Sequence, residues 1–222
     1  MDDSNAEATA KGTFVTQWNG DELIELCKQK HDRDIEAYWN SLIWHNELAE
    51  FFAGRAIEAW DESTRKIAFR EKAFACEAYV VACVQSLNPM ADMLSQIINI
   101  AVLEGSHNEN RVQASRMSEE LRKNGNFGIK GSWDKFYHSG EFRYVRAFCN
   151  TIKHRRLVRT KSIQFDITGT HGGGGNVFMP FKDKDTDYPS LTVSTIVNQY
   201  RLEIRGFVLN TGASINNHLK SL

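Results

Sequence analysis

Apolar side chains recur at helical spacing through most of this chain, and this pattern limits the folds open to it. One run places them at the i, i+3, i+4, i+7 and i+8 positions of a single helix face, at Ile35, Tyr38, Trp39, Leu42 and Ile43. A second run, residues 70–104, is more apolar and is interrupted at Asn88-Pro89, where proline kinks a helix or begins a new one with Asn88 as its cap. Residues 110–123 indicate a shorter, exposed helix. The sequence therefore predicts a mainly α protein.

The remaining composition divides the chain into a tail and one helical domain. Residues 1–18 are small, polar and acidic, which predicts a disordered N-terminal tail. Residues 19–222 are expected to form a single domain with three parts: a bundle core at 19–160, an embedded β-hairpin at 161–182 and a C-terminal helix at 190–220.

The hairpin is indicated by alternation of apolar and polar residues over Ile163, Phe165 and Ile167, followed by a glycine run at Gly172–Gly175. This run lacks the Gly-Lys-Ser/Thr ending that places a lysine and a hydroxyl on a bound phosphate, and it joins two strands instead of opening a helix. We therefore expect a flexible hairpin tip and not a phosphate-binding loop.

Acidic and basic residues nearly balance over the whole chain, with 28 Asp and Glu against 27 Lys and Arg and a formal net charge of −1. This balance argues against a protein that coats nucleic acid through bulk charge. Between residues 141 and 161, however, seven Lys or Arg residues and one histidine accompany a single acid. Any anionic partner is therefore expected to bind at this local patch.

Cysteine and histidine spacing indicates neither a disulfide framework nor a metal site. Cys27, Cys76, Cys83 and Cys149 lie in apolar surroundings without CxxC spacing, which is typical of reduced core thiols. The histidines form no HExxH pattern, so neither a metal nor a cofactor is expected. The N-terminal residues lack the apolar core of a signal peptide and no apolar run could span a bilayer, which predicts a cytoplasmic protein without membrane contact.

The stretch RAFCNTIKHRR, residues 146–156, carries the most informative pattern. On a helix, five polar side chains near it fall within one arc of roughly 100°; they are Arg143, Arg146, Asn150, Lys153 and His154. A solvated helix face usually mixes charge signs, because oppositely charged residues at i and i+4 attract each other. A face with positive charges and no acid favours an anionic partner or an acidic neighbour.

A polar stripe on the second apolar segment is the candidate acidic neighbour. Its members follow 3, 4, 4, 3 spacing and are Gln85, Asn88, Asp92, Gln96 and Asn99. The stripe is either the solvent edge of a helix packing or one wall of a polar cleft. In the second case Asp92, supported by Gln96, would lie near Lys153, His154 or Arg155, where a carboxylate orients an imidazole and raises its pKa.

A long apolar helix followed some fifty residues later by N-x-x-K-H-R, at residues 150–155, resembles the HEPN superfamily of helical bundles over residues 35–160. The resemblance implies an antiparallel bundle and a homodimer whose two motifs share a cleft. Catalytic members of that superfamily cut RNA without a metal, through an arginine and a histidine separated by four to six residues. Here Arg146 lies eight residues before His154, and Ala147, Phe148 and Cys149 stand where the arginine is expected.

Two functions follow from this resemblance and the basic face. In the first, a dimer binds RNA, a nucleotide or another anionic partner without cleaving it, with Arg143, Arg155 and Arg156 as anion-binding groups. In the alternative, the protein is a metal-independent endoribonuclease of toxin or antiviral-defence type. His154 would then be the general acid or base.

In that enzyme Arg146 and Lys153 would stabilise the charge on the phosphorane, and Asn150 would orient His154 or the ribose. A third interpretation makes the motif architectural, with Lys153 and His154 buried against Asp92. The hairpin is in addition a candidate site for a protein partner.

Overall fold

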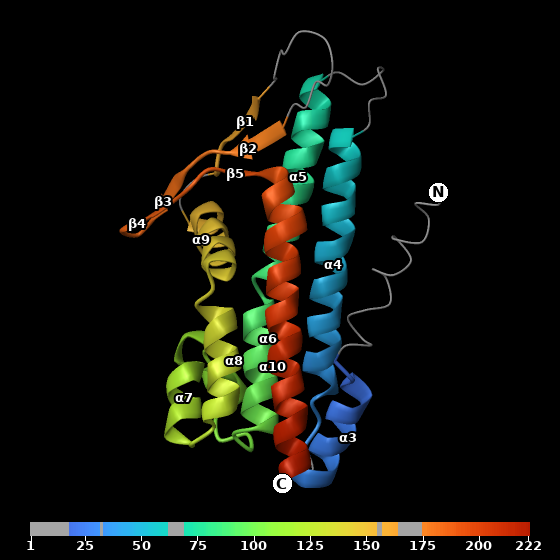
Figure 1. The fold of residues 1–222 in the computed structure, drawn as a ribbon, viewed down its shortest axis with the longest axis vertical. Coiled ribbons are helices and arrows are strands. Elements are labelled where there is room, and N and C mark those ends of the chain that lie inside the picture. The colour runs from blue at the N-terminus through green and yellow to red at the C-terminus, as the bar shows by residue number, and fades with distance from the viewer. Residues whose placement is uncertain (1–17, 32, 62–68, 155–156, 164–174) are drawn as a thin grey trace. The chain divides into compact units, whose positions relative to one another are not determined.

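The computed structural model describes residues 18–31, 33–61, 69–154, 157–163 and 175–222, and it confirms a mainly helical protein with a small antiparallel sheet (Figure 1). The predicted disordered tail at residues 1–17 and the glycines 172–174 lie outside the described residues.

The described residues form two compact units that alternate along the chain. The first unit comprises the described parts of residues 1–45, 89–139 and 205–222, and the second comprises those of residues 46–88 and 140–204. The single domain predicted for residues 19–222 stays a prediction.

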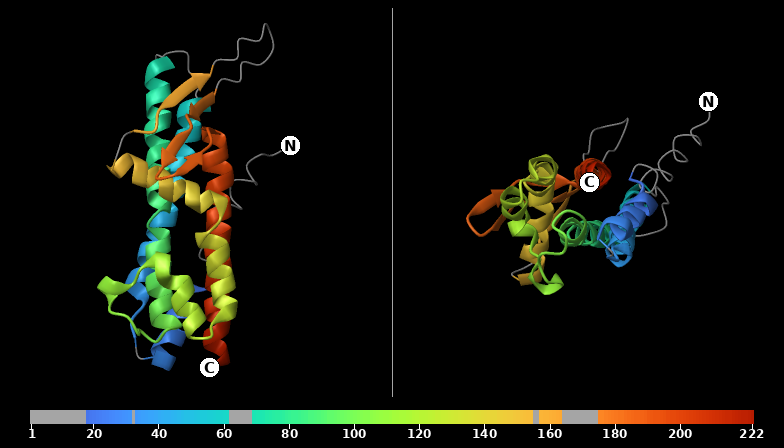
Figure 2. Two further views of the ribbon diagram at one scale, coloured as in Figure 1. Left: turned by 90° about the vertical axis from the view of Figure 1, so that its left-hand side faces the viewer. Right: turned by 90° about the horizontal axis from the view of Figure 1, so that it is seen from below.

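The first unit contains helices and irregular segments, and no strand among its described residues. Its elements are α3 (Gly20–His31), the first part of α4 (Glu36–Asp61), α6 (Met90–Ala101), the 3-10 turns η1 (Glu109–Arg111) and η2 (Ala114–Arg116), α7 (Met117–Lys123), α8 (Phe127–Tyr137) and most of α10 (Arg201–Ser221). Figure 2 shows α8 beside the C-terminal part of α10, where the Ser132 and Ser214 hydroxyl oxygens lie 2.9 Å apart.

Trp18 anchors the start of the described chain in the first unit. Its ring is 1% exposed, meets Trp39 edge-on at 4.8 Å and donates a hydrogen bond from Nε1 to Oδ1 of Asn216 at 3.1 Å. Asn216 in turn donates to the carbonyl of Asn19 and to the Glu22 carboxylate. The prediction that places Trp18 in a disordered tail is therefore wrong, because a buried indole with a satisfied N–H ties this segment to α10.

The predicted break at Asn88-Pro89 is confirmed, since α5 (Phe69–Leu87) ends there and α6 begins at Met90. Pro89 and not Asn88 holds the N-cap position of α6, without a side-chain cap. Farther along α6, the buried Asn99 amide donates to the His107 carbonyl at 2.9 Å and accepts from the His107 N–H at 3.2 Å. These bonds hold the irregular segment after α6 against the helix.

The predicted helix over residues 110–123 is correct only for α7, its last seven residues. The preceding residues form η1 and η2 with extended backbone at Gln113 between them. Gln96 donates a hydrogen bond to the Glu109 carbonyl at 3.0 Å. Together with Asn99, this side chain binds backbone groups of the segment, which competes with helix formation.

The second unit combines helices with two small sheets. Strands β1 (Thr160–Ile163), β2 (Gly175–Phe178) and β5 (Leu191–Thr192) form an antiparallel sheet in the order β1-β2-β5, in which Thr160 pairs with Phe178 and Phe178 with Leu191. The antiparallel β1–β2 pair lies within the hairpin predicted at 161–182, although Phe165 and Ile167 lie outside the described residues. A further hairpin, β3 (Phe181–Asp183) with β4 (Thr186–Tyr188), was not predicted.

Helices α5, α9 (Gly140–His154) and parts of α4 and α10 complete the second unit. The predicted C-terminal helix at 190–220 begins later, with a π-helical turn η3 (Thr195–Tyr200) that leads into α10. Arg201 donates from Nε to the Val197 carbonyl at 2.7 Å and forms an ion pair with Glu50 of α4. All four cysteines are free; Cys27, Cys76 and Cys83 are buried in the core as predicted, whereas Cys149 is only half-buried.

Candidate nucleic-acid interface

Helix α9 carries the predicted motif and is amphipathic in the structure. Its buried residues are Phe142, Tyr144, Val145, Ala147, Phe148 and Thr151. The five polar residues predicted to share an arc lie on the remaining side, which we call the α9 basic face: Arg143, Arg146, Asn150, Lys153 and His154. The structure thus places the predicted helix over Gly140–His154 and buries none of these five residues.

The α9 basic face is open to solvent. Arg143, Lys153 and His154 are exposed, and Arg146 and Asn150 are half-exposed. Among the residues that the structure describes, no hydrogen bond or ion pair engages the side chains of Arg143, Asn150, Lys153 or His154. The positive charges of Arg143 and Lys153 are thus not neutralised within the described part of the chain.

The macrodipole of α9 accounts for only part of this charge. Lys153 and His154 lie in the last turn, where a cation is favoured by about 0.3–1 kcal/mol. Arg143 is the fourth residue of α9, near the end where the dipole disfavours a cation. The macrodipole therefore does not explain a cation at Arg143.

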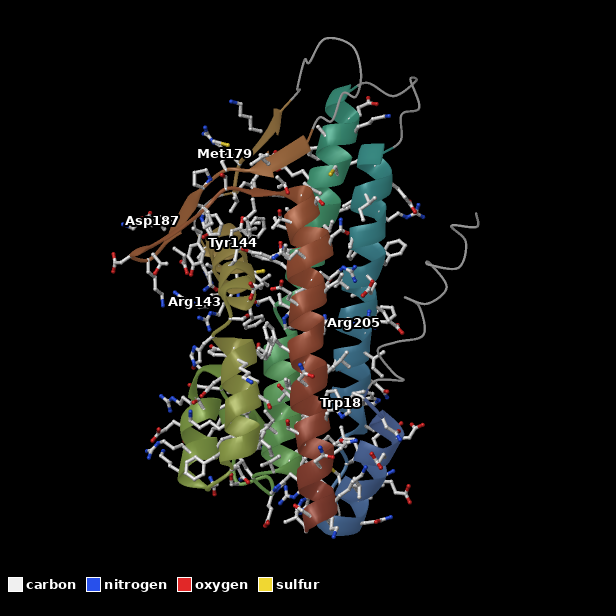
Figure 3. All side chains as sticks on the ribbon, viewed as in Figure 1. Trp18, Arg143, Tyr144, Met179, Asp187 and Arg205 are labelled. Atoms are coloured by element: carbon white, nitrogen blue, oxygen red, sulfur yellow. The ribbon has the colours of Figure 1, made fainter. Side chains whose placement is uncertain are left out.

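An aromatic cluster holds the other side of α9 in place. Tyr144 is its centre, with ring centroids 5.3 Å from Phe181 of β3, 6.0 Å from Tyr188 of β4 and 5.6 Å from Tyr200. Figure 3 labels Tyr144 on α9. Phe148, one turn along α9, meets Phe178 of β2 edge-on at 5.3 Å. Such pairs add about 0.5–1.5 kcal/mol each beyond the area they bury. The strands thereby fix the rotation of α9 and keep its basic face outward.

The Tyr144 hydroxyl is buried without a hydrogen-bond partner among the described residues. Burial is the largest cause that raises the pKa of this phenol, and the neighbouring Tyr200 raises it further. The phenol therefore stays neutral at physiological pH and acts as a packing group.

On its inner side α9 also contacts α5. The Cys149 Sγ approaches the Val84 carbonyl at 3.7 Å, and burial raises the pKa of the Cys149 thiol to about 12. This cysteine is therefore protonated and inert at neutral pH, since only the thiolate is nucleophilic. The motif thus gains no nucleophile from Cys149.

Some predicted site residues lie apart from this face. Arg155 and Arg156 are outside the described residues. Asp92 and Gln96 belong to the first unit, whereas Lys153 and His154 belong to the second, so the predicted pairing stays a prediction.

Asp92 is exposed by area, yet partial enclosure by protein raises the pKa of its carboxyl. Gln96 binds the Glu109 carbonyl within its own unit, so its amide already has a structural partner.

Two further cations of the predicted basic patch follow the motif. Arg159 and Lys161, on and just before strand β1, are exposed. The neighbouring β3–β4 hairpin is mixed in charge, with Lys182 and Lys184 against Asp183, Asp185 and Asp187. The hairpin does not extend the basic surface.

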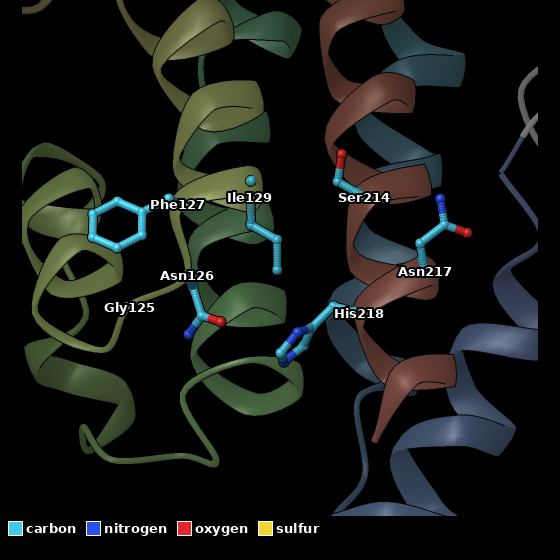
Figure 4. A pocket seen from close by; sticks show the side chains of 8 residues that line it. Gly125, Asn126, Phe127, Ile129, Ser214, Asn217 and His218 are labelled. Carbon is cyan, nitrogen blue, oxygen red and sulfur yellow. The ribbon is translucent and has the colours of Figure 1, made fainter.

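A separate hollow of about 480 Å³ lies in the first unit between the start of α8 and the last turns of α10. Figure 4 shows Ile129 pointing toward α10 and His218 reaching toward Asn126, while Phe127 points away. The described residues that line it include neither a carboxylate nor a Lys or Arg side chain. This hollow therefore offers no fixed charge to an ionic ligand.

No described helix is long and apolar enough to cross a membrane, and within the described ranges no three His, Cys, Asp or Glu side chains are placed to hold a metal ion. Comparisons with models of known protein families, with curated proteins and with solved structures found no match.

Proposed function

We propose that this protein is a HEPN-like, dimeric helical protein whose α9 basic face binds RNA through its phosphates without cleaving it. One observation carries the proposal: Arg143 and Lys153 are exposed at opposite ends of one face and have no carboxylate partner among the described residues. An intramolecular surface ion pair would contribute only about 0–1 kcal/mol. A polyanion that contacts both cations gains more, because it releases condensed counterions.

Binding is better supported than cleavage for two reasons. A general acid or base needs an oriented imidazole, and no described residue forms a hydrogen bond with the exposed His154 ring. Arg146 precedes His154 by eight residues, which separates their Cα atoms by about 12 Å along the helix. That separation suits two phosphates of a strand more than one reacting phosphorus.

The proposal is tested by fluorescence anisotropy with a labelled structured RNA. Arg143→Glu combined with Lys153→Glu is expected to weaken binding at least roughly tenfold at moderate salt, because two phosphate contacts become repulsive. Lys30→Glu combined with Lys135→Glu is the matched control, since it changes the net charge equally at exposed positions of α3 and α8. Equal losses in the two double variants, or no binding by the wild-type protein, would refute an RNA site on α9.

The ribonuclease alternative has its own assay. A mixed pool of labelled RNA is incubated in EDTA with the wild-type protein and with His154→Ala, and we expect the RNA to remain intact in both. Products ending in 2′,3′-cyclic phosphate that disappear in His154→Ala would replace the binding proposal with an enzyme.

A further inference from the structure

We infer that the RNA held by the α9 basic face is a duplex, contacted at its phosphates and 2′-hydroxyls and not at its bases. This inference rests on the proposed function and narrows the class of its partner. Three features support it: the aromatic rings of α9 are buried on the opposite side of the helix, Asn150 adds an uncharged amide to the face, and the two terminal cations are far enough apart to span a groove.

The aromatic rings of α9 are buried and do not lie on the basic face. Phe142, Tyr144 and Phe148 are at most 2% exposed, and the last two are enclosed in the cluster with the strands. Proteins that hold single strands combine cations with exposed aromatic rings on which the bases stack. The α9 basic face has the cations without the rings, so it suits a nucleic acid whose bases remain paired.

Asn150 lies between Arg146 and Lys153 on the face and adds an uncharged donor and acceptor. Its side chain is half-exposed and forms no hydrogen bond with another described residue. A ribose 2′-hydroxyl both donates and accepts hydrogen bonds, which matches the two ends of a side-chain amide. A 2′-hydroxyl also distinguishes RNA from DNA, and a cation alone does not.

The dimensions of the face favour the minor groove of A-form RNA. Arg143 and Lys153 are ten residues apart, which places them about 15 Å apart along the helix axis. The deep, narrow major groove of an RNA duplex excludes side chains, whereas its minor groove is wide, shallow and lined by 2′-hydroxyls. A helix laid across that groove sets its terminal cations against phosphates and its central amide against ribose.

The experiment compares three labelled probes of one sequence: an RNA duplex of about 16–20 base pairs, one of its strands alone, and the corresponding DNA duplex. The wild-type protein is expected to bind the RNA duplex most tightly. Asn150→Ala should weaken RNA-duplex binding about 2- to 12-fold, the value of one hydrogen bond, and leave DNA binding unchanged. Asn40→Ala, at an exposed position of α4, is the matched control and should bind as the wild type does.

Each contrary result has a separate meaning. Tighter binding of the single strand, or equal binding of RNA and DNA duplexes with no effect of Asn150→Ala, overturns the inference and leaves the proposed RNA site standing. Failure of all three probes to bind overturns the proposed function itself. Circular dichroism of both asparagine variants shows that the comparison is made between folded proteins.

Discussion

The Trp18 ring packs directly against Gly212 of α10, which is possible because glycine has no side chain. A Cβ atom at Gly212 would lie 2.1 Å from the Trp18 ring, so alanine there must displace the indole. We expect Gly212→Ala to lower the free energy of unfolding by about 1–3 kcal/mol, as overpacking does. Urea unfolding followed by tryptophan fluorescence measures this loss.

Gly206→Ala is the matched control on the same helix, because a Cβ atom at Gly206 meets nothing within 4 Å. There alanine should be neutral or stabilise the helix by up to about 1 kcal/mol. If Gly212→Ala is as stable as Gly206→Ala, the close packing of Trp18 on Gly212 does not contribute to stability as described.

Two partly buried histidines should make the protein less stable in mild acid. Burial lowers the pKa of His45, and burial together with the nearby His31 lowers that of His218. A lowered folded-state pKa means that unfolding takes up protons, so this stability is present above the unfolded pKa of about 6.5 and is lost as the pH falls. The free energy of unfolding should therefore decrease between about pH 7 and pH 5.

The His218→Gln variant should show a smaller decrease over this range in urea titrations at several pH values. Carboxylates affect stability at lower pH. A hydrogen bond from Lys123 lowers the pKa of Glu120, so the stability that this carboxylate contributes is lost only below about pH 4.5. An identical pH profile in the wild type and in His218→Gln would contradict the role given to His218.

At the scale of elements, Tyr144 joins α9 to the β3–β4 hairpin. Tyr144→Ala should cost about 3–5 kcal/mol of stability, because it removes the centre of the aromatic cluster. Tyr144→Phe keeps the ring and deletes only the hydroxyl that has no partner among the described residues, so the change should stay below about 1 kcal/mol.

Amide hydrogen exchange measures the consequence for the hairpin. Exchange over residues 181–188 should speed up in Tyr144→Ala and stay as in the wild type in Tyr144→Phe, since only alanine removes the ring that the hairpin packs against. Unchanged exchange in Tyr144→Ala would show that the cluster does not hold the hairpin on α9.

The elements that could be predicted from sequence were those with regular spacing of apolar residues and a helix-breaking residue at the boundary. The regular apolar spacing of α4 and the proline between α5 and α6 located these helices well. Helix α8 was missed because Gly128 and Gly131 weaken its helix propensity, although its buried residues follow helical spacing at Ile129, Trp133, Phe136 and Tyr137.

The β3–β4 hairpin was missed because its strands are three residues each, too short for alternation to be visible. The available signal was the polar stretch Asp-Lys-Asp-Thr at residues 183–186. In the structure Asp183 pairs with Thr186, and Lys184 between them adopts a φ of 53°.

The candidate site was predictable in part. The arc of polar residues on α9 is a local property of one helix, and helical geometry alone placed it correctly. Tyr144 is enclosed by strands that follow it by as many as 44 residues in the sequence. This enclosure depends on tertiary packing, which no local sequence pattern predicts. Likewise, the polar stripe at Gln96 and Asn99 binds backbone of the segment that follows, a use that spacing does not distinguish from a cleft.

For the whole molecule, the formal net charge is only −1, so the proposal attributes RNA binding to the α9 basic face and not to bulk charge. The direct test is the slope of log K against log salt concentration for RNA binding. Because each contacted phosphate contributes roughly 0.7–0.9 to this slope, loss of both contacts in Arg143→Glu combined with Lys153→Glu should reduce its magnitude by about 1.4–1.8. A slope equal to that of the wild type would contradict the account, because it would mean that neither cation touches the RNA.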